Sequence, residues 1–253
     1  MRELWYFEGG ELLHGRERIM PGTTLQLLVN LHEDELRAWH GPAFAAAQRT
    51  RGAAVSGLYL QPFAIDTHGQ RRVVGAVFRP GAAAVVLGVP SDALAGAHTE
   101  LEALWSAGAA TLRERLLEAQ SPARVLALLD ALLVERISGE LDPIVTAACR
   151  ELERGARVAA VADHVGLGRK RLGERFSAAV GVSPKAYARL ARLQRVLGAA
   201  AGPKRLDWAQ LAVLCGYYDQ AHLIQEFREL SGVTPAHYRP RAAGELNHMV
   251  LAP

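Results

Sequence analysis

The chain is poor in cysteine and lacks any long apolar run. Only two of its residues are cysteines, Cys149 and Cys215, which is too few for a metal cluster of the CxxC type and unsuited to a secreted disulfide framework. We expect both thiols to be reduced. No apolar run reaches the roughly 18 residues that span a bilayer, and the first ten residues do not resemble a secretory signal. We therefore expect a cytoplasmic protein with no membrane partner.

Composition and charge are those of a globular protein with one basic half. Half of the residues are hydrophobic (50%) and 22% are charged, which excludes a disordered tail or a fibre, and 253 residues suffice for one or two domains. The net charge of +3 is unevenly spread. Residues 141–253 carry 16 Lys and Arg against 10 Asp and Glu, whereas residues 1–140 carry 13 against 16. This asymmetry indicates an anionic partner, most commonly nucleic acid, with a merely solvated surface as the alternative.

The spacing of apolar and turn-forming residues changes along the chain and predicts an α+β protein. Short β-type runs at 25–31, 55–60 and 73–78 are separated by turn-forming residues, so the first part is expected to be mostly antiparallel sheet. From residue 101 to residue 137 the apolar residues recur at helical spacing, and Ser121 followed by Pro122 is a good helix start, which together predict two helices. The pattern stops at 138–140, and Asp142 with Pro143 starts a new helix.

These changes divide the chain into three expected segments. The first is an N-terminal effector or dimerisation domain at 1–138, β-rich over 1–95 and helical over 99–138. The second is an all-α DNA-binding domain at 141–241 with two helix-turn-helix units, and the third is a tail at 242–253.

The second segment contains an internal repeat. The pattern L-x3-F-x4-G-V-[ST]-P-x2-Y begins at Leu172 and again at Leu223, an offset of 51 residues. Upstream of each copy lies a short apolar helix that ends in glycine, Gly166 or Gly216. A helix-turn-helix has three such features. A small residue lies where its two helices cross, a glycine ends the first helix, and a Leu and a Phe four residues apart anchor the second helix. The alternative interpretation is that these are paired helices of an all-α core that do not bind DNA.

The outward faces of the second helices suit DNA. If Leu172 and Phe176 face inward, a step of about 100° per residue turns polar residues outward in both copies. In the first copy these include Lys170, Arg171 and Glu174, and in the second they include Gln220, His222 and Gln225. Cationic side chains that are better candidates for phosphate contacts are Arg169, Arg175, Lys185, Arg189 and Arg228.

These motifs resemble the AraC/XylS family of bacterial transcription regulators. GYYDQAHLIQEFRELSGVTPAHYR at 216–239 is similar to the signature of the family's second helix-turn-helix, and GLGRKRLGERFSAAVGVSPKAYAR at 166–189 is similar to the first. The resemblance implies a regulator, an activator or a repressor, whose two recognition helices enter successive major-groove segments on one face of double-stranded DNA, with RNA polymerase as a further partner. It implies base contacts for Lys170 and Glu174, and for Gln220, His222 and Gln225.

The first recognition helix departs from the family pattern. Gly168 stands where the family usually has a serine N-cap, which costs only a few tenths of a kcal/mol. Gly173 lies inside the helix, at a cost of ~1 kcal/mol relative to alanine. Glu174 accepts from cytosine but repels phosphates, so an ion pair with Lys170 or Arg171 is an equal alternative to base readout.

The family couples its DNA-binding domain to an effector or dimerisation domain, often a small β-barrel, and the resemblance implies a small β-barrel-like domain with helices in the N-terminal part of this chain. Residues 16–31 and 78–90 resemble the N-terminal domain of an uncharacterised regulator subgroup, which implies a small-molecule effector, a homodimer, or both. We expect neither a metal nor a cofactor, because the histidines of this half lack the spacing of a metal site: His14, His32, His40 and His68.

Two alternatives remain open. In one, the N-terminal domain senses nothing and only holds two subunits together. In the other, the chain is an enzyme of the DNA-alkyl repair type with Cys149 as its nucleophile, although no His and acid arrangement surrounds that cysteine in the sequence. The hypothesis that the sequence favours over both is a sequence-specific regulator without catalytic residues.

Overall fold

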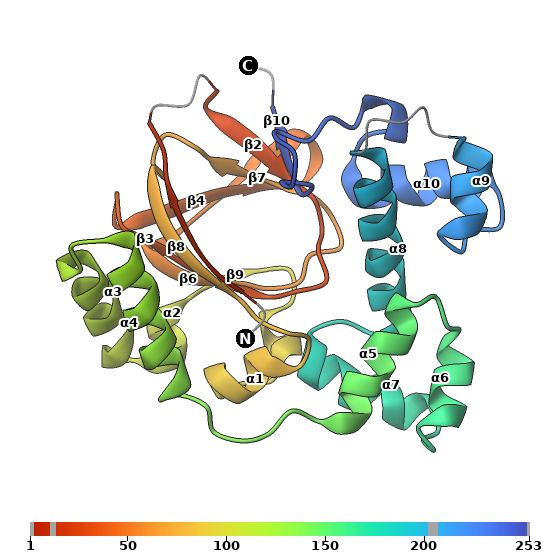
Figure 1. The fold of residues 1–253 in the computed structure, drawn as a ribbon, viewed down its shortest axis with the longest axis horizontal. Helices are drawn as coiled ribbons and strands as arrows, with labels where there is room; N and C mark the ends of the chain where they lie inside the picture. Colours follow the sequence, from red (N-terminus) through yellow and green to blue (C-terminus); the bar gives the residue numbers. More distant parts are fainter. Residues whose placement is uncertain (1–2, 11–13, 202–206, 252–253) are drawn as a thin grey trace.

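The N-terminal part consists of two antiparallel sheets flanked by helices, and the C-terminal part is helical (Figure 1). The computed structural model describes residues 3–10, 14–201 and 207–251. This is the mixed α+β architecture that the sequence predicts. The strands form two five-stranded sheets and do not close into one barrel, so the barrel-like arrangement expected for this domain is not confirmed.

The first sheet holds the three strands that the sequence predicts. Its order is β1-β8-β3-β6-β9, with β1 at Glu3–Glu8, β3 at Gln26–Asn30, β6 at Ala53–Ser56, β8 at Arg72–Val77 and β9 at His98–Glu100. The predicted runs at 25–31 and 73–78 match β3 and β8 closely, while β6 ends before residue 57. Leu27, Val55 and Val74 are fully buried in the core that this sheet covers.

The second sheet comes from segments with a weaker sequence signal. Its order is β10-β2-β7-β4-β5, with β2 at Arg16–Ile19, β4 at Glu35–His40, β5 at Ala46–Arg51, β7 at Phe63–Asp66 and β10 at His248–Val250. Strand β5 exposes most of its residues, and β2 consists of three charged residues followed by Ile19, so neither strand contains an apolar run. Strand β10 belongs to the expected tail, of which residues 252–253 lie outside the described part.

The described part of the N-terminal domain also contains four α-helices: α1 at Ala82–Leu87, α2 at Leu101–Trp105, α3 at Ala107–Glu118 and α4 at Pro122–Val134. The 101–137 stretch therefore forms three helices where two were predicted, because Ser106 adopts a φ of 48° and separates α2 from α3. The predicted start of α4 is confirmed, since Ser121 accepts a hydrogen bond from Arg124 N.

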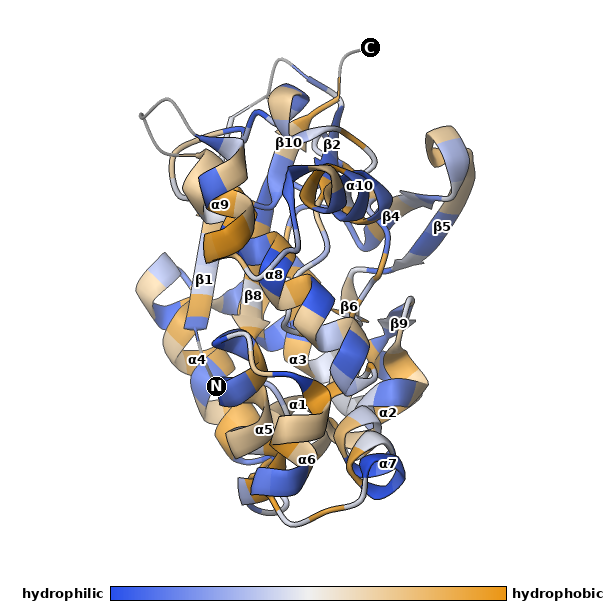
Figure 2. Cartoon of the chain, turned by 90° about the vertical axis from the view of Figure 1, so that its right-hand side faces the viewer, coloured by the Kyte–Doolittle hydropathy of each residue, from blue (hydrophilic) through white to orange (hydrophobic). Residues whose placement is uncertain are grey.

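The C-terminal helices are built around one long helix. They are α5 at Pro143–Glu153, α6 at Val158–His164, α7 at Arg169–Val180, α8 at Pro184–Ala200, α9 at Trp208–Leu214 and α10 at Gln220–Ser231. Asp142 caps α5 through its side chain, as the sequence predicts, and Ser183 caps α8 in the same way. Figure 2 looks onto this domain, with α8 across its centre, α6 and α7 at one end, and α9 and α10 at the other.

The chain returns to the N-terminal domain after the last helix. Strand β10 pairs antiparallel with β2, and the two lie together at the top of Figure 1. Beside them the fully buried carboxylate of Glu17 receives Arg241 Nη1 at 2.7 Å, His248 Nδ1 at 2.8 Å and His14 Nε2 at 2.6 Å. Burial raises the pKa of Glu17, but these hydrogen bonds outweigh burial and lower it to about 2. The tail is thereby held on the sheet by charge.

Candidate nucleic-acid interface

The two repeat copies fold into helix pairs of the same design. Gly166 and Gly216 take positive φ values of 67° and 81° at the turn that follows α6 and α9. Ala162 and Ala212 are buried where the helices cross. The anchors of the second helices are fully buried in both copies: Leu172 and Phe176 in α7, Leu223 and Phe227 in α10. Helices α7 and α10 are therefore the two candidate readers.

The polar residues predicted to face outward are exposed. On and beside the first reader these are Arg169, Lys170, Arg171, Glu174 and Lys185, and on the second they are Gln220, His222, Gln225 and Arg228. The same step of about 100° that buries the Leu and Phe anchors turns them outward. Each reader thus offers donors and acceptors on a face that its own domain leaves uncovered.

Within the described part of the chain, the first reader begins without a side-chain cap. Its N-cap residue is Gly168, and Gly173 lies within the helix. The Lys170 ammonium lies 4.0 Å from the Glu174 carboxylate, and both side chains are largely exposed. This is the surface ion pair named above as the alternative to base readout by Glu174, and exposed pairs of this kind contribute ~0.5 kcal/mol at most.

The second reader is capped and its polar side chains are oriented. Asp219 accepts a hydrogen bond from His222 N at 2.7 Å, which satisfies one of the free amides at the start of α10. The ring of His222 packs edge-on against Tyr217, and its Nδ1 lies 3.4 Å from Tyr218 N. Gln225 Nε2 donates to Glu229 Oε1 at 3.1 Å.

Three arginines on one face of α8 hold the second unit. Arg189 Nε and Arg192 Nη2 donate to the buried Glu226 carboxylate of α10 at 2.9 and 2.8 Å. Arg189 Nη2 also donates to Glu229 Oε2 at 2.7 Å, and Arg195 Nη2 donates to the Cys215 carbonyl at 2.9 Å. The guanidinium of Arg189 is thus engaged at both edges, which does not favour the phosphate contact that the sequence predicts for it.

Glu226 is the residue that sequence reasoning missed. Only 6% of its surface is exposed although it is charged. Two features of the sequence could have indicated its burial. Glu226 directly precedes the anchor Phe227, on the inward side of α10, and arginines recur every three residues along the helix that α10 packs against, at 189, 192 and 195. A carboxylate on a buried helix face needs a cationic partner, and this row of arginines supplies two.

Arg175 is likewise taken by a partner within the domain. Its guanidinium donates to both oxygens of Asp142, the residue that caps α5, with Nη2 at 3.0 Å from Oδ1. Arg175 occupies the repeat position of Glu226, because 226 minus the offset of 51 is 175. Its ion pair ties the start of α5 to α7.

A family comparison decides the class of this domain. The model of a helix-turn-helix domain matches residues 146–241, which contain both units, both readers and α8. The C-terminal domain is an AraC-type helix-turn-helix domain. This confirms the family resemblance drawn from the two repeat motifs, and it supports a DNA-binding transcription regulator.

The region before the AraC-type domain matches a second family model. Residues 2–100 match a domain of unknown function, DUF6597, in agreement with the resemblance to an uncharacterised regulator subgroup. No curated protein sequence matches the chain significantly.

Several solved structures are similar to the chain. ToxT from Vibrio cholerae, crystallised with an unsaturated fatty acid, is 9% identical, with 94% of this chain and 96% of that chain covered and a TM-score of 0.46. The C-terminal domain of AraT, a response regulator from Geobacillus stearothermophilus, is 18% identical over 42% of this chain and 98% of its own, with a TM-score of 0.36. The DNA-binding domain of AdpA in complex with a target DNA is 22% identical over 38% and 85%, with a TM-score of 0.33.

The N-terminal domain touches the AraC-type domain at the C-terminal ends of both readers. Ser91 Oγ donates to the Ala179 carbonyl near the end of α7 at 2.8 Å. Arg18 Nη1 donates to the Ser231 carbonyl at the end of α10 at 3.2 Å. Between them, Gln194 of α8 donates to the Pro21 carbonyl at 2.7 Å. The N-terminal domain therefore contacts both readers and the helix that joins them.

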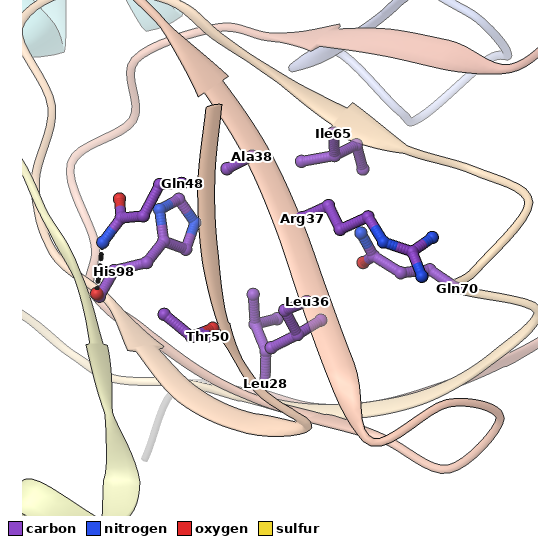
Figure 3. Close-up of a pocket in the computed structure, with 9 residues that line it drawn as sticks. All are labelled: Leu28, Leu36, Arg37, Ala38, Gln48, Thr50, Ile65, Gln70 and His98. Carbon is purple, nitrogen blue, oxygen red and sulfur yellow. Dashed lines mark hydrogen bonds between the residues drawn. The ribbon is translucent and has the colours of Figure 1, made fainter. Parts of the chain in front are cut away.

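A small cavity lined by both apolar and polar side chains lies between the two sheets (Figure 3). It measures about 10 Å³, room for about one water molecule, and its lining includes Thr50, Gln48 and His98. Gln48 Nε2 donates to the His98 carbonyl at 2.9 Å, while the buried Thr50 Oγ1 has no hydrogen-bond partner among the described residues. Beside it, Tyr59 Oη lies 2.6 Å from His98 Nδ1, and burial, aided by His40, lowers the pKa of His98 to about 3.

Neither a metal centre nor a reactive cysteine emerges from the described residues. No group of three or more His, Cys, Asp and Glu side chains there is arranged to hold a metal ion. Cys149 is buried in α5 of the AraC-type domain, and burial together with Glu153 raises its pKa to about 12. A thiol with this pKa is almost fully protonated at neutral pH, which does not favour a nucleophilic role. Within the described residues, every helix is too short or too polar to span a bilayer.

Proposed function

We propose that the protein is a sequence-specific transcription regulator in which α7 and α10 enter successive major-groove segments on one face of double-stranded DNA. The observation that carries this proposal is the pair of exposed polar reader faces, built by one repeated motif and joined through the single helix α8. A major groove about 12 Å wide admits one α-helix, and two readers on a rigid connector fit two groove segments.

The exposed reader residues divide into two roles. Lys170, Arg171 and Glu174 on α7, and Gln220, His222 and Gln225 on α10, are proposed to face base edges. Arg169, Lys185 and Arg228, which are exposed cations at the margins of the same faces, are proposed to contact phosphates. Arg189, with its guanidinium engaged by Glu226 and Glu229, is better suited to positioning α10 than to binding phosphate.

The N-terminal domain is proposed to control reading. Residues 1–138 would receive a small-molecule effector or a second copy of the chain, and the contacts of Ser91 and Arg18 with the ends of α7 and α10 offer a path from that domain to both readers. A change at either contact alters the orientation of a reader relative to α8. Activation through RNA polymerase, a homodimer and a location in the cytoplasm belong to the same proposal.

Selection from a genomic DNA-fragment library tests the proposal. The purified chain is incubated with the library at about 50 and 200 mM salt, and the retained fragments are sequenced. We expect one enriched site with two half-elements about one helical turn apart, and an affinity that falls steeply with salt because phosphate contacts release counterions. Retention without sequence preference at both salt concentrations would contradict it.

Two variants separate the proposed roles. Gln225→Ala is expected to relax the preference at one base pair, whereas Lys185→Ala is expected to weaken all sequences alike and to reduce the salt slope by about one. Equal effects of both variants on every sequence would overturn the assignment of Gln225 to base readout. Effector control is tested by repeating the selection with candidate small molecules and comparing the affinity for the enriched site.

A further inference from the structure

Gln225 lies on the outward face of α10 in a shallow surface hollow. The other residues that line this hollow are Ala221, Ile224, Arg228, Glu229 and Thr234. A glutamine side chain carries an acceptor and two donors on opposite sides of one amide group, so its orientation decides which base edge it fits.

Glu229 determines how the amide of Gln225 is turned. It follows Gln225 by one helical turn, and its Oε1 accepts from Gln225 Nε2 at 3.1 Å. A carboxylate only accepts hydrogen bonds, so the amide nitrogen has to face Glu229, and the carbonyl oxygen is the group turned away from it. The orientation is therefore imposed by the chemistry of the neighbour.

The Glu229 carboxylate is itself bound by a residue of α8. Its second oxygen, Oε2, accepts from Arg189 Nη2 of α8 at 2.7 Å. The other edge of Arg189 donates to the buried Glu226, which also binds Arg192. The pair Arg189 and Glu229 is thus anchored at the packed contact between α8 and α10, and Gln225 stands at its exposed end.

We infer that Arg189 and Glu229 are positioning residues that present the carbonyl oxygen of Gln225 to a base carrying an amino group in the major groove. This inference rests on the proposed function. Adenine N6 and cytosine N4 are the two amino groups available there, whereas guanine O6 and thymine O4 place an acceptor against the carbonyl oxygen. The contacted base is therefore adenine or cytosine on one strand, and guanine or thymine is rejected.

Selection of the full-length chain on a randomised duplex library tests this inference. Gln225→Ala first identifies the base pair whose preference depends on Gln225. At that pair the wild-type chain is expected to select adenine or cytosine on one strand, and which of the two it selects distinguishes the N6 from the N4 contact. Glu229→Leu is expected to lower this preference by about fivefold or more while leaving the other positions unchanged.

Three further variants separate the positioning of Gln225 from a general effect of charge. Asp163→Asn removes one negative charge from the first unit, and it is expected to change the affinity for all sequences alike without changing the preference at the Gln225 pair. Arg189→Lys keeps the positive charge but loses the fork that bridges Glu226 and Glu229, so a smaller loss of preference at the same pair is expected. In the Gln225→Ala background, Glu229→Leu is expected to have no further effect at that pair.

The outcomes separate this inference from the function on which it rests. Selection of adenine and guanine alike, which share the N7 acceptor, means that Gln225 donates through its nitrogen and overturns the inference. So does a Glu229→Leu variant whose preference stays within twofold of the wild type. If the wild-type chain enriches no sequence at all, the proposed function fails, and the inference fails with it.

Discussion

The two helix-turn-helix units share one repeat and are fastened in different ways. Both bury the same Leu and Phe anchors, and both readers end at a glycine of positive φ, Gly181 and Gly232. The second reader has a side-chain cap and an ion-paired carboxylate against α8, while the first has an uncapped start and an internal glycine. The buried apolar residues are therefore the same in both copies, whereas the polar contacts that hold each reader in place differ between them.

The largest expected effect tests the common scaffold. Phe176 and Phe227 are equally buried and each packs edge-on against a tyrosine, Tyr187 or Tyr238. Phe176→Ala and Phe227→Ala should each lower the free energy of unfolding by about 3–5 kcal/mol, because a cavity replaces a fully packed ring. Urea titrations measure both losses. A difference above about 2 kcal/mol between the two would break the equivalence of the copies.

Acid should weaken the end of the second unit, which is fastened to the sheet by charge. The folded pKa of Glu17, about 2, lies below its ordinary value of 4.5, so its stabilisation is present above about pH 4.5 and is lost as the pH falls toward 2. The expected contribution is ~3 kcal/mol at neutral pH. Urea titrations between pH 6 and about pH 2.5 should show this loss in the wild type, and Glu17→Gln should show a smaller dependence on pH. An unchanged acid response in Glu17→Gln would contradict the role of the Glu17 carboxylate.

Removing the buried carboxylate of α10 sharpens the difference in fastening. Glu226→Ala leaves the guanidinium of Arg192 without its carboxylate partner and is expected to cost about 2 kcal/mol in free energy of unfolding. Arg175→Ala at the equivalent position breaks a more exposed ion pair with Asp142 and should cost less than ~1 kcal/mol. Equal losses from both variants would mean that the second unit is not specially fastened by charge.

The smallest expected effect is a gain in the first reader. A methyl group on Gly173 would meet no atom within 4 Å in the described part of the chain, and the residue is helical. Gly173→Ala should therefore raise the free energy of unfolding by about 0.5–1 kcal/mol, since it removes the entropic cost of a glycine within a helix. Thermal unfolding measures this gain. A destabilised variant would show that α7 relies on Gly173 for a close contact.

Much of the C-terminal domain follows from local sequence signals. The cap Asp142 and the turn glycines Gly166 and Gly216 act within a few residues of their own position, as does Ser121 in the N-terminal domain, and the structure confirms them. Helix α1 and the division of 101–137 into three helices were not predicted. The first depends on Gly81, which reads equally well as a simple turn, and the second depends on the single positive φ of Ser106.

By itself the sequence determined the repeat, the start of α5, the turns that follow α6 and α9, and the residues on the outward reader faces, because apolar spacing and capping are short-range effects. Only the tertiary structure decided the partners of its charged groups. Arg189 and Glu226 lie 37 residues apart in the chain, and Glu17 and His248 lie 231 apart, so no local pattern records that they meet. Such pairs form because the packed helices and sheets bring distant carboxylates and cations together out of water, where each needs a partner of opposite charge.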